Sequence, residues 1–324
     1  GGISSYAPLV GHTGFYEYLP DSDQWVARTT PPFGAVYRAA AFVEEQTASG
    51  WLIGGSRTDP YLPSNEVWKY DPFIDVWTQM ASLPGQGREG AVVIPLNGVS
   101  FAAGLGGEPG LNDWYAYDIL NDQWSARADL PGGGRTGATA GLTPYFYIPL
   151  VGMGAASLAD SATTFFDDWY TYAYDQDTWI PYPMELPQSI PRAGVAMGSL
   201  DHWNVGLVDF FFGGHGVVNG ERTVLGDCYA SALLDGYYLG IRPGGPVTNA
   251  VALSSLEEEC IYIGTGCTSF LPGTWKPATF SDAWLRYTPG GLSLGVDDQI
   301  PPTITWRSDG AHLHVQWPAG SGNV

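Results

Sequence analysis

Arginines recur at similar places along the chain, and each of them opens a run of small residues. Four of the eleven arginines do so, namely Arg38, Arg88, Arg135 and Arg192. A guanidinium offers paired hydrogen bonds to a carboxylate, so arginines gathered at one place would form a positive collar able to bind an acidic ligand. The structural alternative is that each arginine ties its own segment to neighbouring carbonyls or acids. The residues alone leave both interpretations open.

The five histidines offer little for metal chemistry. A copper-radical oxidase needs two tyrosines, two histidines and a cysteine around one metal. His312 and His314 are two residues apart on an expected strand, and we expect them at the surface. His215 directly follows a diglycine, which places it with the arginines as a candidate ligand contact. We therefore expect no metal centre and no bound cofactor.

A second candidate site combines carboxylates with aromatic faces, as sugar-binding surfaces do. It consists of Asp167, Asp168, Trp169 and Tyr170. The alternative is that these are ordinary aromatics of a repeat. The 33 acids of the chain allow many pairs of the kind that cleaves glycosides, but no motif surrounds any of them. No GxSxG motif of a serine hydrolase occurs either.

The charge balance narrows the classes of partner. Asp and Glu number 33 against 13 Lys and Arg, which gives a formal charge of −20. Nucleic acids and anionic membranes need clustered basic residues, so neither is expected as a partner. No apolar run approaches the roughly 20 residues of a membrane-spanning helix, which argues against direct membrane insertion. The opening Gly1-Gly2 suggests a processed or trimmed product.

One pattern recurs at intervals of about 50 residues, a spacing typical of propeller blades. It begins with an acidic or small residue, continues with alternating aromatics and a turn, and ends with an aromatic eleven residues after the start. The copies run from Gly14 to Trp25, Glu66 to Trp77, Asp113 to Trp124, Asp168 to Trp179 and Asp227 to Tyr238, with a weaker sixth beginning at Asp282.

The chemistry of each copy indicates a hairpin. Its aromatics alternate with the period of two that strands require. An aspartate stands two residues before the closing Trp at Asp23, Asp75, Asp122 and Asp177. Asp in such turns usually accepts hydrogen bonds from backbone N–H groups, and the Trp can fill the wedge between neighbouring blades. Calcium binding by these aspartates is a further alternative, although they lack the dense spacing of a calcium loop.

Diglycines upstream, spaced aromatics ending in Trp, and an arginine before a strand of small residues together resemble the Kelch repeat. The resemblance extends to about residue 300 and is best over residues 38–180. It implies an all-β, six-bladed Kelch-type β-propeller with about four antiparallel strands per blade. Kelch propellers serve as protein-binding platforms, carbohydrate-active enzymes, sugar isomerases and copper oxidases, so the resemblance predicts a fold more than a function.

The two ends of the chain lead to one further expectation. We expect residues 1–300 to form the propeller and residues 301–324 to form a β-hairpin tail around a Ser-Asp-Gly turn. This tail would complete the first blade, which starts at its diglycine, or would begin a C-terminal sorting domain like those of surface proteins from Bacteroidota-type bacteria. The style of the blades also resembles Kelch proteins that such bacteria secrete, which implies a secreted or cell-surface location.

These observations favour a non-catalytic binding or assembly propeller. It would engage a protein or an acidic ligand at one pole, through Arg38, Arg88, Arg135, Arg192 and His215. The alternative is a carbohydrate-active enzyme or sugar isomerase of the mutarotase type. That alternative would show an arginine paired with Glu or Asp in a pocket on the axis.

Overall fold

A computed structural model gives the architecture of the chain, which is all-β apart from two short 3-10 turns, η1 (Pro20–Ser22) and η2 (Tyr174–Gln176). The structure describes residues 2–290, except 7, 23, 45, 59–60, 98, 143–148, 160–161, 185, 187, 203–205, 233–234, 242–244, 256–259, 281–283 and 288, together with 305–308 and 313–316. None of the helices in this part of the chain has the length and apolar character needed to cross a membrane.

Within the described residues, six antiparallel sheets coincide with the copies of the predicted repeat. Four of them have four strands. They are formed by β6 (Ala40–Glu44), β7 (Ser49–Ile53), β10 (Val67–Asp71) and β11 (Val76–Met80); by β12 (Val92–Asn97), β13 (Ser100–Gly104), β14 (Trp114–Asp118) and β15 (Gln123–Arg127); by β16 (Thr139–Leu142), β17 (Pro149–Gly152), β18 (Trp169–Ala173) and β19 (Thr178–Pro181); and by β21 (Ala196–His202), β22 (Gly206–Phe212), β25 (Asp227–Ala232) and β26 (Asp235–Ile241). The other two are β27 (Val251–Ser255), β28 (Cys260–Gly264) and β31 (Trp284–Tyr287); and β3 (Tyr16–Leu19) with β4 (Gln24–Ala27).

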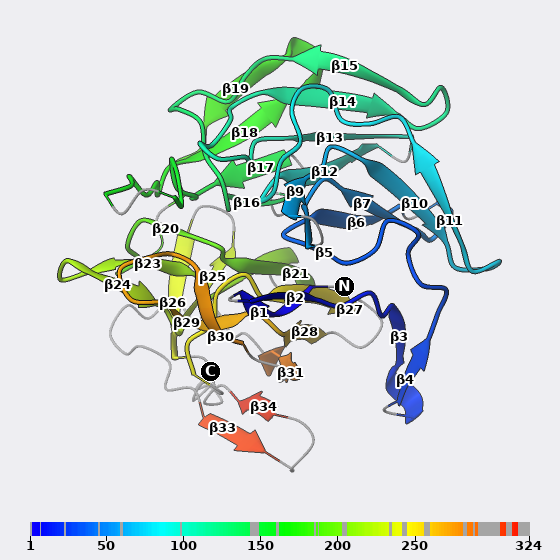
Figure 1. Ribbon diagram of the computed structural model, residues 1–324. Coiled ribbons are helices and arrows are strands. Elements are labelled where there is room, and N and C mark those ends of the chain that lie inside the picture. The colour runs from blue at the N-terminus through cyan, green and yellow to red at the C-terminus, as the bar shows by residue number, and fades with distance from the viewer. Residues whose placement is uncertain are drawn as a thin grey trace, which may run out of the picture.

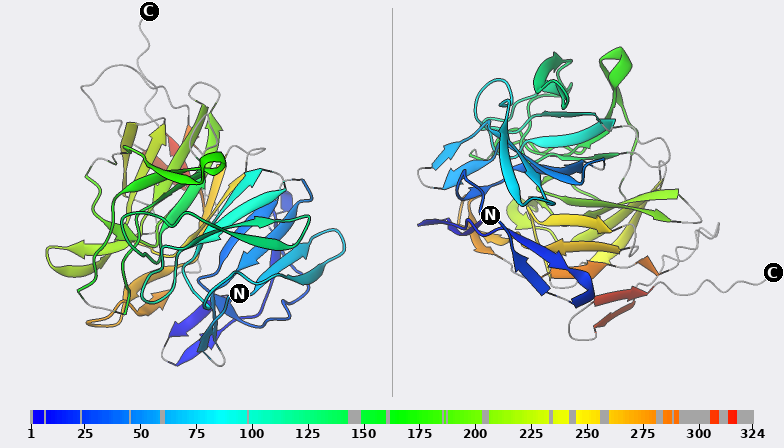
Figure 2. Two further views of the ribbon diagram at one scale, coloured as in Figure 1. Left: turned by 90° about the horizontal axis from the view of Figure 1, so that it is seen from above. Right: turned by 90° about the vertical axis from the view of Figure 1, so that its right-hand side faces the viewer.

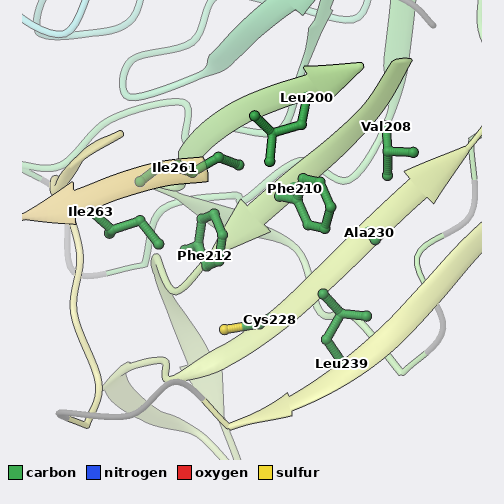
Figure 3. Close-up of a cluster of buried hydrophobic side chains, with 10 residues drawn as sticks. Leu200, Val208, Phe210, Phe212, Cys228, Ala230, Leu239, Ile261 and Ile263 are labelled. Atoms are coloured by element: carbon green, nitrogen blue, oxygen red, sulfur yellow. The ribbon is translucent and has the colours of Figure 1, made fainter. Parts of the chain in front are cut away.

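Successive sheets lie around a common centre, as the colour sequence of Figure 1 shows. The first strands of neighbouring sheets, β6, β12, β16, β21 and β27, contact one another in that order. Each buried apolar cluster joins two successive sheets. Ile261 and Ile263 of β28, for example, pack with Phe210 and Phe212 of β22 (Figure 3). Because each sheet buries its faces against its neighbours, the arrangement is a β-propeller-like fold.

A repeated contact joins the outer hairpin of one sheet to the sheet before it. Asp122 accepts hydrogen bonds from the hydroxyl of Tyr117 and from the Ala81 N–H, at 2.7 Å for the latter. The Trp124 indole N–H donates to the carbonyl of the same Ala81 at 2.8 Å. The equivalent groups are Asp75 and Trp77 on Thr29, and Asp177 and Trp179 on Ala128. The predicted roles of the turn aspartate and the wedge tryptophan are confirmed at these three places.

Loops that follow the diglycines form a second layer at one pole. They fold as small sheets: β5 (Val36–Tyr37), β8 (Ser56–Thr58) and β9 (Tyr61–Pro63); β20 (Arg192–Ala193), β23 (His215–Val218) and β24 (Glu221–Val224); and β29 (Cys267–Phe270) with β30 (Pro277–Phe280). The N-terminal pair β1 (Ile3–Tyr6) and β2 (Leu9–Gly11) joins them, because β1 contacts β30 and β2 contacts β8.

The expected roles of the two ends remain predictions. In the tail, β33 (Thr305–Ser308) and β34 (Leu313–Gln316) are antiparallel neighbours (Figure 2). The strand β34 also pairs with β32 (Pro289–Gly290). Within the described residues, β3 and β4 form a sheet of two strands. Asp23, Asp282 and most of 301–324 lie outside the described residues, so a closing or sorting role for the tail and the total of six blades stay predictions.

Candidate functional site

Three of the predicted pole arginines lie inside the blades. Arg88 and Arg135 have no exposed surface, and Arg192 is 1% exposed. Each pairs with the aspartate at or directly before the start of the third strand in the four-stranded sheet that follows it along the chain. Arg135 contacts Asp168 at 2.7 Å, Arg192 contacts Asp227 at 2.6 Å, and Arg88 pairs with Asp113.

These arginines also hold the bend at the diglycine. Each donates a hydrogen bond to a backbone carbonyl there, to Leu105, Met153 or Gly213. These guanidinium groups are buried and paired with aspartates and backbone carbonyls of the protein, so they do not form an accessible surface. The prediction of an accessible collar is therefore wrong for Arg88, Arg135 and Arg192, and the structural alternative holds, with ion pairs inside one blade.

Arg38 occupies a different place from the other three. It has a left-handed backbone with φ 53°, a conformation shared by Gly90, Gly137, Gly194 and Asn249. These five residues form a chain of backbone hydrogen bonds around the centre, each N–H donating to the carbonyl of the preceding member. Arg38 is thus equivalent to the glycine two residues after each buried arginine, and its assignment to their repeat position is wrong.

This shift brings the Arg38 side chain to the axis, where it remains partly exposed. Its guanidinium pairs with Glu89 and donates to the Thr136 hydroxyl at 3.2 Å. The other Glu89 oxygen accepts from the Ser56 hydroxyl at 2.6 Å. The ion pair is therefore held on both sides by hydroxyl groups, that of Thr136 on Arg38 and that of Ser56 on Glu89.

His215 lines the same cavity as this pair. It begins β23, and Nδ1 is 2.7 Å from the Thr248 hydroxyl. Burial, and secondarily the positive charge of Arg38, lowers the pKa of His215 to about 3, so the ring is neutral at ordinary pH. Its ring lies against three aromatic rings, those of Phe165, Phe270 and Trp275.

Arg38, Glu89 and His215 line one cavity of about 880 Å³. Aromatic side chains form much of its wall, and these include Tyr6, Phe33, Tyr37, Trp77, Trp275 and Phe280. Lys276 and Glu108 also line the cavity and add one further charge of each sign. A pocket with aromatic walls and a few fixed polar groups is the usual form of a small-molecule site.

The predicted sugar platform does not form. Trp169 is buried between sheets with its ring against Phe211, and Asp168 is the partner of Arg135. Desolvation, and secondarily a hydrogen bond to Asp168, raises the pKa of Tyr170. Only Asp167 is exposed. These residues are ordinary members of the repeat, so this prediction is wrong.

Four residues around the pocket were not predicted from the sequence, namely Glu89, Trp275, Thr136 and Thr248. Glu89, Thr136 and Thr248 each stand directly before a left-handed residue of this chain of backbone hydrogen bonds. That position varies from blade to blade while its neighbours repeat, and this variation was the available signal. Trp275 lies in the turn between β29 and β30, where no repeat pattern marks it. In the described part of the chain, no three His, Cys, Asp or Glu side chains gather closely enough to hold a metal ion.

Comparison with known proteins supports the fold and leaves the ligand open. No protein-family model matches the chain, and no curated protein matches it. Among solved structures, the one titled "Structure of YjhT" has a TM-score of 0.65 and 16% sequence identity, over 85% of this chain and 89% of that one. At this identity the likeness concerns the β-propeller-like fold alone.

Proposed function

We propose that the axial pocket binds a small carbohydrate, and that the chain is a sugar-binding propeller of six Kelch-like blades. The observation that carries this proposal is the fixed Arg38–Glu89 pair lining an aromatic-walled cavity. Sugars present hydroxyl edges and apolar faces, and such a wall and such a charge pair complement both. The secreted or cell-surface location inferred from the style of the blades belongs to the same proposal.

Carbohydrate binding in the pocket replaces the expectation from the sequence, which was a protein or an acidic ligand bound at an arginine collar. Three of the four arginines needed for that collar are buried. Of the basic groups that line the pocket, Arg38 is paired with Glu89. The basis for a strongly anionic partner is therefore gone.

The decisive experiment is titration calorimetry with a panel of neutral and acidic mono- and disaccharides. We expect at least one to bind the wild-type protein. Arg38→Gly should weaken that binding about tenfold or more, because it removes the guanidinium while glycine suits the left-handed backbone. Arg28→Gln is the matched control, since Arg28 pairs with Glu17 at the surface and is not among the residues that line the pocket. Absence of binding across the panel contradicts the proposal.

A sugar isomerase of the mutarotase type is the second candidate, favoured by the same Arg38–Glu89 pair. Interconversion of anomers needs a base for the anomeric hydroxyl and a donor for the ring oxygen. A neutral His215 with a pKa of about 3 is a weak base, and both carboxylate oxygens of Glu89 already accept hydrogen bonds, from Arg38 and Ser56. Binding is therefore placed first. An NMR assay of anomer equilibration, including sialic acid, decides between the two, because acceleration by the wild-type protein that Arg38→Gly abolishes would establish catalysis.

A further inference from the structure

Two buried ring nitrogens of the pocket have no hydrogen-bond partner among the described residues. They are Nε2 of His215 and Nε1 of Trp275. Both residues line the cavity, and their ring centroids are 5.2 Å apart. A buried polar atom left without a partner costs free energy, so such atoms in a native protein usually mark an unmade contact to a ligand or to water.

The hydrogen bonds around His215 decide what its free nitrogen can do. The hydroxyl of Thr248 lies 3.2 Å from the Gly194 carbonyl oxygen and 2.7 Å from His215 Nδ1. When its hydrogen is directed to Gly194, Nδ1 carries the ring proton and donates to Thr248, and Nε2 is a bare hydrogen-bond acceptor. A ligand hydroxyl that donates to Nε2 selects this tautomer.

Trp275 supplies the opposite function. An indole N–H can only donate. Its ring is 6% exposed and is held edge-on by Phe165 and Phe270, with centroids 5.1 and 5.2 Å away. The Arg222 guanidinium lies 5.4 Å from the ring centroid. The donor is thus rigid, and it stands beside the rigid acceptor.

We propose that His215 Nε2 and Trp275 Nε1 together recognise hydroxyl groups of a neutral sugar. His215 accepts from one sugar O–H, and Trp275 donates to a sugar oxygen on the same or the neighbouring carbon. This inference rests on the proposed function, because it names the class of carbohydrate that the pocket takes.

The charges of the pocket favour a neutral sugar over an acidic one. The side chains of Arg38 and Lys276 are matched in number by those of Glu89 and Glu108. The whole chain carries a formal charge of −20, which opposes the approach of an anion. The two buried nitrogens without partners, His215 Nε2 and Trp275 Nε1, add one hydrogen-bond acceptor and one donor without adding charge.

The test compares variants that remove one atom while keeping the ring environment. His215→Asn retains an amide near Nδ1 for Thr248 and removes the acceptor at Nε2. Trp275→Phe retains an aromatic ring and removes the N–H. Each should weaken the affinity for the best neutral sugar about tenfold or more, as loss of a partner to a buried polar group does. Trp124→Phe is the matched control, because it removes the same indole N–H from a residue outside the cavity lining, where the group donates to the Ala81 carbonyl.

Monodeoxy analogues of that sugar identify the contact. One analogue should bind the wild-type protein weakly and His215→Asn equally weakly, which would show that the missing hydroxyl and Nε2 are partners. Thermal unfolding of each variant confirms that the fold is retained, and His215→Gln serves if His215→Asn does not fold.

The outcomes separate the two proposals. If no sugar binds the wild-type protein, the proposed function fails. If sugars bind but His215→Asn and Trp275→Phe bind as tightly as Trp124→Phe, the proposed function stands and this inference is overturned, because the two nitrogens then contact only water. Preference for acidic over neutral sugars would also overturn it.

Discussion

The backbone N–H of Gly90 donates to the carbonyl of Arg38 at 2.8 Å, and both residues have a left-handed conformation, with φ 67° and 53°. Each further blade adds one link of the same kind, through Gly137 and Gly194 to Asn249. Arg38 therefore stands where most blades have glycine. This explains why one arginine reaches the axis while three others stay inside their blades.

A side chain at Gly194, a member of this chain of backbone hydrogen bonds, should strongly destabilise the fold. A Cβ there would lie 2.4 Å from the Thr248 hydroxyl and 3.1 Å from His215 Nδ1. Gly194→Ala should therefore lower the free energy of unfolding by about 2 to 4 kcal/mol, combining left-handed strain with overpacking, and should displace His215. Chemical denaturation measures the loss.

Gly220→Ala is the control for this prediction. Gly220 has φ 82°, but a Cβ there would meet nothing within 4 Å. It should cost only the conformational strain of about 1 kcal/mol. Equal losses for the two variants would show that the axial crowding has no effect on stability.

Loss of a buried ion pair should lower the free energy of unfolding more than loss of an exposed ion pair. Arg135 has no exposed side-chain surface, whereas Asp168 is 35% exposed. Asp168→Asn leaves a buried guanidinium without its counter-charge and should cost about 3 kcal/mol of unfolding free energy. Glu17→Gln, which breaks an exposed pair with Arg28, should cost less than about 1 kcal/mol. Similar losses for both would mean that burial of Arg135 does not set its dependence on Asp168.

Asp122 and Trp124 join two successive blades, and their contributions to the free energy of unfolding should be coupled. Asp122 and Trp124 bind the N–H and the carbonyl of Ala81. Asp122→Ala should cost about 1 to 3 kcal/mol, because Asp122 also holds the Tyr117 hydroxyl. Trp124→Phe should cost less. The double variant should fall short of the sum, since both groups fix one residue.

Asp118→Ala is the comparison for the blade contact. Asp118 caps the same turn but binds only groups of that turn, the N–H groups of Leu120 and Asn121 and the Asn121 amide. Strict additivity of Asp122→Ala and Trp124→Phe in urea unfolding would contradict a shared contact.

The sequence predicted those features that repeat with a fixed spacing. Asp122 and Trp124 could be placed because the same types recur at the same offset in other blades. Arg38 was misplaced because its residue type was matched to Arg88, although the glycines at 90, 137 and 194 mark the true register two positions later. The pocket itself could not be predicted, because Glu89 and Trp275 lie where the repeat varies, and only the folded ring brings them beside His215.

The last prediction concerns Asp209, a buried carboxyl in the centre of one blade. It lies on β22, where its backbone pairs with Ser199 of β21 and Ser231 of β25. The Ser199 hydroxyl donates to Oδ1 at 2.6 Å, while Oδ2 and the Ser231 hydroxyl have no partner among the described residues. Burial raises the pKa of Asp209 to about 7, despite the hydrogen bond from Ser199. Desolvation, and secondarily the charge of Asp209, raises the pKa of the nearby Tyr182.

The folded protein therefore binds a proton at Asp209 that the unfolded chain has released above pH of about 4. Its contribution to stability is fully present at low pH, declines as the pH rises from about 4 to 7, and is constant above that range. Asp209→Asn removes this decline. It should raise the free energy of unfolding at pH 8 by on the order of a few kcal/mol relative to wild type and change it little at pH 4. Urea unfolding of both proteins at several pH values measures the difference, and parallel pH profiles for the two would mean that Asp209 does not titrate abnormally in the fold.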